Sequence, residues 1–354
     1  MRKVFLGLLM FFAARIGAGS LGSVAEILMT TAHKRTPPPP ARVVPPPKPP
    51  PDMTRYLPSP GELRQFARVE ASRTYKLSYG FVDYVGHHHL VSCGIDKADV
   101  ETEQTAYGYV SEEMRIALNA RLQTLMEAEA VRRGVREHIR ITMEGWGGYT
   151  WKMSWDTEAT RQELEDLKGW LDAEIPTRRE AILQELYRAH GFLVRGDRVR
   201  IDYNAIARRA TPHVGDCFQA LLRSAEGYPT KQVVGLLLAF YQELKYEVPP
   251  DQVGAKRTMG LWVPAEVLAS GKGDCDSKAV AFAAMWRRLE PRVIVILVPH
   301  HALIGVEAKP GPDESYVRVG NRYFVLCEVA GPAKLRPGYH SLKGSFEYVL
   351  IDPA

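Results

Sequence analysis

Cys275 is the residue whose type and setting most directly suggest covalent chemistry. It follows the glycine-rich stretch 271–274 and precedes the apolar segment 280–286, so it falls in the first turn of a predicted helix. The glycines allow a tight turn, and Asp274 can accept hydrogen bonds from the free N–H groups of that turn. The helix dipole favours an ionised thiol at this position, and the thiolate is the nucleophilic form. Cys275 is therefore a candidate catalytic nucleophile.

A nucleophilic cysteine in this setting needs a cationic partner, because the adjacent Asp274 and Asp276 oppose ionisation of the thiol. His301 lies about one strand pair further along the chain, at the start of a predicted strand over 300–306. Its imidazole would take the thiol proton and later protonate the leaving amine. The neighbouring His300 is the rival for this role.

A carboxylate follows on the next predicted strand, at Glu328. Adjacent antiparallel strands would bring His301 and Glu328 side by side, so that the carboxylate orients the imidazole and stabilises the imidazolium. Asp313 and Glu314 are the alternatives, although they lie in a predicted Gly-Pro loop.

The carbonyl attacked by Cys275 would become an oxyanion, which needs hydrogen-bond donors. The backbone N–H of Cys275 is one such donor, and the side chains of Trp262 and Gln242 are candidates for a second. This chemistry requires no metal and no organic cofactor, so we expect neither.

The residues around the three candidate catalytic groups form a wider pattern. It consists of Gly273–Ala279, His301–Val306 and Leu326–Val329, with Phe240–Tyr246 and the Trp262-x-Pro264 segment upstream. This pattern resembles the transglutaminase-like superfamily of bacterial cysteine peptidases and acyltransferases, over roughly residues 205–335. The resemblance implies a papain-like core in which Cys275 is the nucleophile and His301 the base. The third member is commonly Asp in that superfamily, whereas this chain offers Glu328.

A second Gly-Asp-Cys tripeptide ends at Cys217, with His213 close by. It is a rival nucleophile, but it lies among apolar residues and has no glycine-rich approach. No histidine and acid follow it on predicted strands, so we interpret Cys217 as a core residue.

The N-terminal part of the chain predicts export and a spacer. Residues 1–25 begin with Arg2 and Lys3, followed by a short apolar run up to Arg15 and by small residues near Ala25, typical of a signal peptide or, alternatively, a membrane anchor. Residues 26–58 form a proline-rich linker, whose prolines favour extended polyproline II. We therefore expect an exported, periplasmic or cell-envelope protein that is either free or tethered to the membrane.

Two predicted domains follow the linker, and together they indicate an α+β protein. Residues 59–203 read as an accessory α/β domain with strands around 75–91 and 139–155, a helix over 111–133, a helix over 157–189 broken at Pro176, and a hairpin over 192–203. Residues 204–354 read as the catalytic domain, a helix-borne cysteine packed on an antiparallel sheet. Its predicted elements are helices over 211–224 and 230–246 and strands over 293–298, 300–306 and 323–329.

Composition excludes several other classes of protein. The net charge of +5 includes three cations of the predicted signal, so it gives no argument for nucleic-acid binding. The four cysteines contain no Cys-x-x-Cys pair, which argues against a zinc ribbon or a disulfide scaffold. Pairing of Cys93 with Cys217 or Cys327 stays open. His87, His88 and His89 are adjacent on a predicted strand and so cannot all face one metal.

The sequence therefore predicts an exported cysteine enzyme that attacks a peptide or glutamine amide in a peptide or protein substrate. Cys275 would form a thioester, released by hydrolysis or, alternatively, by acyl transfer to an amine. The hypotheses from other classes are a non-catalytic module that binds a peptide or envelope partner on the same fold, and a structural envelope protein that works through residues 59–203.

Overall fold

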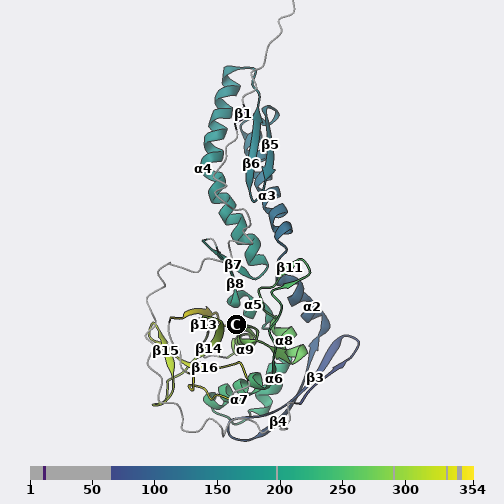
Figure 1. The fold of residues 1–354 in the computed structure, drawn as a ribbon, viewed down its shortest axis with the longest axis vertical. Helices are drawn as coiled ribbons and strands as arrows, with labels where there is room; N and C mark the ends of the chain where they lie inside the picture. Colours follow the sequence, from purple (N-terminus) through teal and green to yellow (C-terminus); the bar gives the residue numbers. More distant parts are fainter. Residues whose placement is uncertain (1–10, 13–64, 197, 290–291, 332–333, 341–344) are drawn as a thin grey trace, which may run out of the picture. The chain divides into compact units, whose positions relative to one another are not determined.

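The computed structural model describes residues 11–12, 65–196, 198–289, 292–331, 334–340 and 345–354 (Figure 1). It has both long helices and antiparallel sheets, so the predicted α+β class is confirmed. The chain divides into two compact units. Of the described residues, one unit contains 11–12, 109–201 and 255–257, and the other contains 65–108, 202–254 and 258–354.

The smaller unit is built on two long helices, α3 (Ser111–Arg132) and α4 (Glu158–Ala189). Their apolar residues recur every three or four positions and are buried, because α3 and α4 pack against each other. Figure 1 shows a hairpin beside them. The remaining elements of this unit are β1 (Phe11–Phe12), η2 (Arg136–His138), β5 (Ile139–Glu144), β6 (Gly148–Met153), β7 (Phe192–Arg195), β8 (Arg198–Ile201) and β11 (Lys256–Arg257).

Helix α4 passes through Pro176 without a break, so the predicted interruption there is wrong. A proline inside a helix loses one N–H bond and crowds the carbonyl four residues earlier. Pro176 and Asp172, the residue that carries that carbonyl, are both exposed, so water can satisfy the carbonyl. Buried Leu171, Ile175 and Leu183 continue the apolar stripe through the proline, and their packing keeps the two halves in one helix.

The larger unit contains a five-stranded antiparallel sheet with the order β15-β16-β14-β13-β17. The strands are β13 (Val293–Val298), β14 (His301–Glu307), β15 (Tyr316–Val319), β16 (Arg322–Cys327) and β17 (Glu347–Ile351). The continuous apolar run of β13 predicts a strand with neighbours on both sides, and β13 indeed pairs with β14 and β17. A buried cluster on this sheet includes Ile294, Ile296, Leu303, Phe324 and Leu326.

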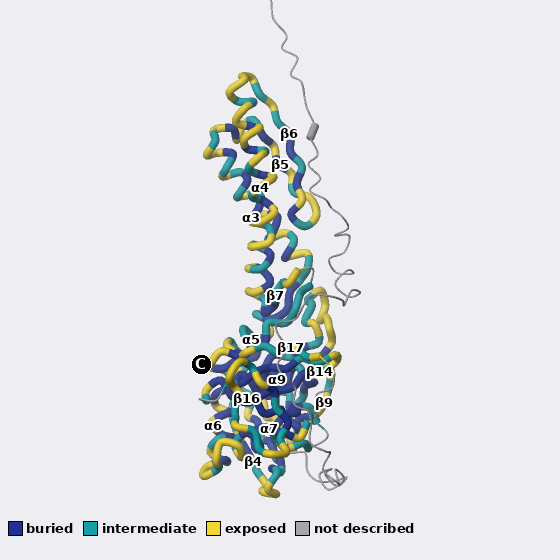
Figure 2. Tube along the Cα trace, turned by 90° about the vertical axis from the view of Figure 1, so that its left-hand side faces the viewer, coloured by how far each residue is buried: buried dark blue, intermediate teal, exposed yellow. Residues whose placement is uncertain are grey.

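Helix α9 (Cys275–Trp286) is the centre of the larger unit. All its residues except Asp276 are buried, and it packs against β13 and β14 of the sheet and against α5 and α8. Figure 2 shows the buried colour concentrated around α9 and α7. The other helices are α2 (Lys97–Ala106), α5 (Tyr203–Ala210), α6 (Gly215–Ser224), α7 (Thr230–Glu243) and α8 (Pro264–Ser270).

A three-stranded antiparallel sheet, β2 (Gln65–Glu70), β3 (Thr74–Val82) and β4 (His88–Asp96), also belongs to the larger unit. A disulfide joins Cys93 of β4 to Cys217 of α6. The predicted boundary at 203/204 assigns these strands to the accessory domain. The structure instead divides the chain at 108/109 and 201/202, because residues 65–108 make their contacts with α6, α7 and α8.

One helix boundary near the candidate site differs from prediction. Helix α7 ends at Glu243 rather than at 246, because Lys245–Tyr246 form the short strand β9. Strand β9 pairs in parallel with β12 (Lys272–Gly273), directly before Cys275. The short helix α5 is not predicted as a separate element. The remaining described strand is β10 (Gln252–Val253).

No helix among the described residues is both long and apolar enough to cross a membrane. Of the predicted signal or anchor over residues 1–25, only Phe11–Phe12 are described, as β1, which pairs antiparallel with β6. The proline-rich linker over 26–58 lies outside the described residues.

Candidate active site

The glycine-rich turn before Cys275 forms as the sequence predicts. Gly271 has φ +65° and ends α8 in the left-handed conformation, where glycine carries no steric penalty. Asp274 is the N-cap of α9, and its carboxylate accepts a hydrogen bond of 2.9 Å from the Ser277 N–H. Cys275 is thereby the first residue of α9 and is 5% exposed.

Both carboxylates that flank the thiol are engaged in hydrogen bonds. Asp274 caps the helix, and the hydroxyl of Tyr203 donates a hydrogen bond of 2.7 Å to Asp276. Burial raises the pKa of Asp274 and of Asp276 above their usual values. The opposition of these acids to a thiolate is therefore weaker than the sequence suggests, because burial disfavours their charged forms.

His301 and Glu328 lie together, as predicted. Nε2 of His301 is 2.7 Å from Oε2 of Glu328. His301 is the first residue of β14, while Glu328 follows directly after β16, the strand that pairs with β14. The rival His300 occupies the turn between β13 and β14 with φ +62°, and the structure does not bring it to Glu328.

His301 also forms a hydrogen bond with the thiol of Cys275. Since Glu328 contacts Nε2, Nδ1 is the ring nitrogen left to face the sulfur. The hydrogen bonds with Cys275 and Glu328 outweigh burial and raise the pKa of His301 to about 10. The imidazole is then protonated at neutral pH, and an imidazolium stabilises a neighbouring thiolate.

A second imidazole, which the sequence analysis missed, lies at the same carboxylate. Nδ1 of His340 is 3.5 Å from Oε2 of Glu328, and the His340 and His301 rings are 6.2 Å apart. Burial lowers the pKa of His340, so this ring is the neutral one of the pair. The other oxygen of Glu328 accepts a hydrogen bond of 2.8 Å from the Ala330 N–H. His340 lies in a loop without strand or helix periodicity, so no pattern in the sequence predicts its position.

Gln242 supports the acid and does not face the thiol, which corrects its prediction as an oxyanion donor. Its Nε2 donates to the backbone carbonyls of Glu328 and Leu335, and its Oε1 accepts from the hydroxyl of Tyr84. The amide N–H groups are thus already used. Gln242 fixes the chain segment that carries Glu328 to the end of α7.

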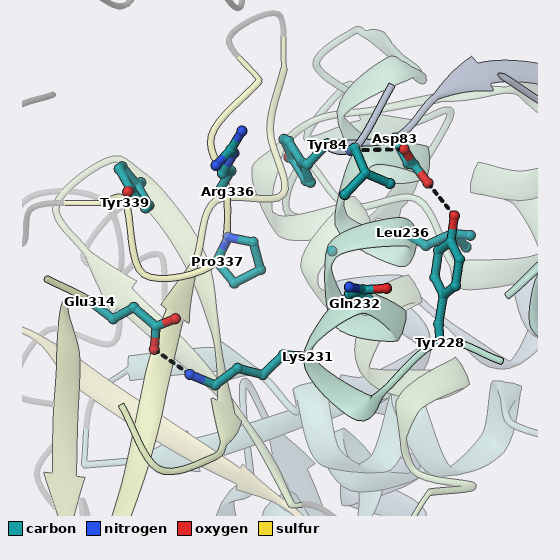
Figure 3. Close-up of a pocket in the computed structure, with 12 residues that line it drawn as sticks. Asp83, Tyr84, Tyr228, Lys231, Gln232, Leu236, Glu314, Arg336, Pro337 and Tyr339 are labelled. Carbon is teal, nitrogen blue, oxygen red and sulfur yellow. Dashed lines mark hydrogen bonds and ion pairs between the residues drawn. The ribbon is translucent and has the colours of Figure 1, made fainter. Parts of the chain in front are cut away.

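Tyr84 also lines a pocket of about 350 Å³ in the larger unit (Figure 3). Lys231 and Glu314 form an ion pair of 2.7 Å at this pocket. Glu314 additionally accepts a hydrogen bond from the Gly311 N–H, so this alternative acid is engaged elsewhere. The other alternative, Asp313, is exposed in the same loop.

Tyr246 is a further residue that the sequence analysis missed, because the pattern placed it in a helix. It ends β9 opposite Gly273, and its hydroxyl forms a hydrogen bond with Cys275. The buried ammonium of Lys278 holds this region by donating to the Leu244 carbonyl at 2.6 Å. A phenol is thereby positioned at the sulfur.

Trp262 lies beside the first turn of α9, where its backbone N–H donates to Ser277 Oγ at 3.0 Å. Nζ of Lys272 lies 4.5 Å from the centre of its ring. These contacts give the indole N–H no assigned role, so Trp262 as an oxyanion donor stays a prediction.

The rival Cys217 is held in the disulfide with Cys93. It is 1% exposed, in agreement with its interpretation as a core residue, and it carries no free thiol. Cys275 and Cys327 are the free cysteines among the described residues. Cys327 is fully buried, and burial raises the pKa of its thiol. Cys275 is thus the free thiol that has an imidazole partner.

The positions that could suggest a metal have other partners. Donor atoms of Asp274, Cys275 and Asp276 lie within 4.8 Å of one another, but they are the same groups that cap α9 and bond to Tyr203 and His301. In the His87–His89 run, Nε2 of His89 is 2.9 Å from Asp83, and Nδ1 of His87 is 2.6 Å from the Tyr228 hydroxyl. Nδ1 of His87 also lies 3.8 Å from the Asp83 oxygen that His89 contacts, Oδ2, so two of the three imidazoles meet at one carboxylate.

Comparisons of the chain with protein-family models, with curated proteins and with solved structures found no match.

Proposed function

We propose that this protein is a cysteine enzyme of the transglutaminase-like type, with a papain-like core, that hydrolyses a peptide or glutamine amide. The observation that carries the proposal is the arrangement around His301. One side of its imidazole bonds to the thiol at the start of α9, and Nε2 lies 2.7 Å from Glu328. A free thiol, a base and an orienting acid in this order are the parts that nucleophilic acyl transfer needs.

Each group has one role in the reaction. The Cys275 thiolate attacks the carbonyl carbon, and the C–N bond of the tetrahedral adduct then breaks while His301 gives its proton to the leaving amine. A thioester remains on Cys275. His301, now neutral, takes a proton from water as the water attacks the thioester, which releases the carboxylic acid and regenerates the thiolate. Glu328 holds the imidazole in place and stabilises its charged form.

The oxyanion of the adduct would accept hydrogen bonds from the Cys275 N–H and from Tyr246. The oxyanion forms on the carbon bonded to sulfur, so a hydroxyl that already bonds to the sulfur is within reach of it. Tyr246 would thus take the donor role that was predicted for Gln242.

Export to an oxidising compartment is part of the proposal, with a peptide or protein of the cell envelope as the substrate. The Cys93–Cys217 disulfide supports this location, since such bonds persist mainly outside the cytosol.

The test is acylation of the purified full-length protein by p-nitrophenyl acetate, with p-nitrophenolate release followed by absorbance and the acetylated residue mapped by mass spectrometry. We expect a burst of one equivalent, acetylation at Cys275, and loss of the burst in Cys275→Ala. A reaction no faster in the wild type than in Cys275→Ala would contradict the proposal and favour the binding module. Adding a primary amine separates the two fates of the thioester, because hydrolysis predicts acetate as the main product and transfer predicts the acetamide.

A further inference from the structure

A cavity of about 430 Å³, separate from the pocket of Figure 3, has four aromatic rings in its lining. We call it the aromatic pocket. It is lined by Phe66, Tyr79, Gly80, Phe81, Phe240, Glu243, Leu244, Lys245, Ser270 and Gly271. An apolar cavity of roughly 150 Å³ holds a benzene molecule. The aromatic pocket therefore has room for a whole benzyl or isobutyl side chain.

The floor of the aromatic pocket is preformed. The ring of Phe240 lies 5.0 Å from that of Tyr79 and 5.7 Å from that of Phe81, both edge-on. Phe66 lies 5.4 Å from Tyr79. The hydroxyl of Tyr79 donates a hydrogen bond of 2.7 Å to the Leu268 carbonyl, so the one polar group of these four rings is satisfied. An apolar ligand would meet rings that are already packed and whose one polar group, the Tyr79 hydroxyl, is already hydrogen-bonded.

The charged groups at the pocket are already paired. Glu243 forms an ion pair with Lys334, and Nζ of Lys245 is 2.8 Å from Glu247. A charged ligand would have to compete with these pairs, whereas an apolar one would not. The lining therefore favours an aromatic or branched aliphatic group.

One wall of the aromatic pocket continues to the thiol. Lys245 and Gly271 belong to this wall, and the Lys245 N–H bonds to the Gly271 carbonyl at the start of the β9–β12 pairing. The same pairing ends at Tyr246 and Gly273, and Tyr246 bonds to Cys275. A peptide with its carbonyl at the sulfur can therefore lie along this short ladder with a side chain in the pocket.

We propose that the aromatic pocket is the specificity subsite of the enzyme, which receives a phenylalanine-like or leucine-like side chain on the acyl side of the attacked amide. This inference rests on the proposed function, since it assigns the substrate class of the same site. It predicts a preference for apolar peptides over acidic or hydroxylated ones.

The test uses two peptidyl chloromethyl ketones, acetyl-Phe-Gly and acetyl-Ser-Gly, on the purified full-length protein, with labelling of Cys275 followed by mass spectrometry. Burying a phenyl side chain is worth enough to predict labelling by the Phe probe about ten-fold faster or more. Iodoacetamide, which has no side chain, is measured in parallel. A Phe/Ser ratio near one, with rapid iodoacetamide labelling, would overturn the subsite and leave the proposed function standing. Slow iodoacetamide labelling would instead count against the proposed function.

Variants of the lining residues test whether the aromatic pocket causes the preference for the Phe probe. Phe66→Ala removes one wall of the pocket, and we expect it to reduce the Phe/Ser ratio several-fold without changing the iodoacetamide rate. Val69→Ala is the matched control, because Val69 lies on the same strand, is 63% exposed and does not line the pocket. Ser270→Phe fills the cavity from the end of α8 and should also lower the ratio. An unchanged ratio in both Phe66→Ala and Ser270→Phe would refute the assignment.

Discussion

The chain contains two Gly-Asp-Cys tripeptides in the larger unit, one at 215–217 and one at 273–275, each at the start of a helix. In α9 the aspartate caps the helix and the cysteine is its first residue. In α6 the cysteine is the third residue, and Asp216 accepts a hydrogen bond of 2.7 Å from the Gly94 N–H on β4. The tripeptide at 273–275 therefore presents a free thiol at the start of α9. The tripeptide at 215–217 instead attaches α6 to strand β4.

The partners of the two cysteines explain the difference. Cys217 forms a disulfide with Cys93. The nearby His213 contacts Glu103, with its Nδ1 2.7 Å from the Glu103 carboxylate. That carboxylate also accepts the Ala265 N–H near the start of α8, so the pair is structural. Cys275 instead meets an imidazole held by an acid. A helix start suits a thiolate in general, but the imidazole decides whether it becomes a nucleophile.

The largest expected contrast comes from removing each histidine. His301→Ala should slow acylation of Cys275 by p-nitrophenyl acetate by about 10²-fold or more, because it removes the base and the counter-ion. His213→Ala, the matched change near the other tripeptide, should leave the rate unchanged. The measurement is the burst rate of p-nitrophenolate release. Equal rates in the two variants would contradict the proposal that only the tripeptide at 273–275 carries a catalytic cysteine.

Removing the Cys93–Cys217 disulfide tests the structural role of the tripeptide at 215–217. The double variant Cys93→Ala/Cys217→Ala should lower the free energy of unfolding by about 2–5 kcal/mol. Its effect on the acylation rate of Cys275 should be small. Urea unfolding followed by circular dichroism gives the first quantity, and the burst assay gives the second. Lost acylation in a folded double variant would show that Cys217 has a part in the chemistry.

Tyr246→Phe tests whether the hydroxyl of Tyr246 stabilises the oxyanion. It removes only a hydroxyl, so the fold should persist, while acylation by p-nitrophenyl acetate should fall at least about ten-fold because the adduct loses one donor. Alkylation by iodoacetamide forms no oxyanion and should change far less. A similar loss in both reactions would mean that Tyr246 acts on the thiolate itself.

The smallest expected effect concerns pH and the His213–Glu103 pair. The hydrogen bond with Glu103 raises the pKa of His213 above its usual value. Burial raises the pKa of Glu103, so the pair stabilises the fold where Glu103 is ionised and His213 is protonated. The contribution of His213 is present below its unfolded pKa of about 6.5 and is lost as the pH rises through its folded pKa. Compared with the wild type, His213→Gln should lose about 1 kcal/mol at pH 6 and less at pH 9. A difference in urea midpoint that does not change with pH would refute this assignment.

Much of the candidate site was predictable because local rules fix it. The glycines, the capping Asp274 and the apolar run after Cys275 specify a loop and a buried helix start. The β-branched run of β13 specifies an inner strand, and the order of strands then places His301 near Glu328. Each of these steps depends on residues close together in the sequence.

The parts that could not be predicted depend on contacts between distant segments. The apolar pattern of α7 continues past Glu243, but pairing with β12 turns Lys245–Tyr246 into a strand and carries Tyr246 to the thiol. His340 reaches Glu328 from a loop. Gln242 was placed near the site correctly, yet its partners Tyr84 and Leu335 are 158 and 93 residues away in the chain. The compact units differ from the predicted boundary at 203/204 for the same reason, since β2–β4 pack with helices more than a hundred residues later.

The most direct test of the central claim is the rate of alkylation of Cys275 by iodoacetamide between about pH 5 and 9 in the full-length protein, with each cysteine mapped by mass spectrometry. Buried Cys327 serves as the internal reference. The account predicts rapid labelling of Cys275 that persists below neutral pH, because the His301 imidazolium, with a pKa of about 10, stabilises the neighbouring thiolate. It also predicts that His301→Asn loses this reactivity at low pH. Labelling that rises only with the titration of a free thiol near pH 8.5, equally in both proteins, would contradict it.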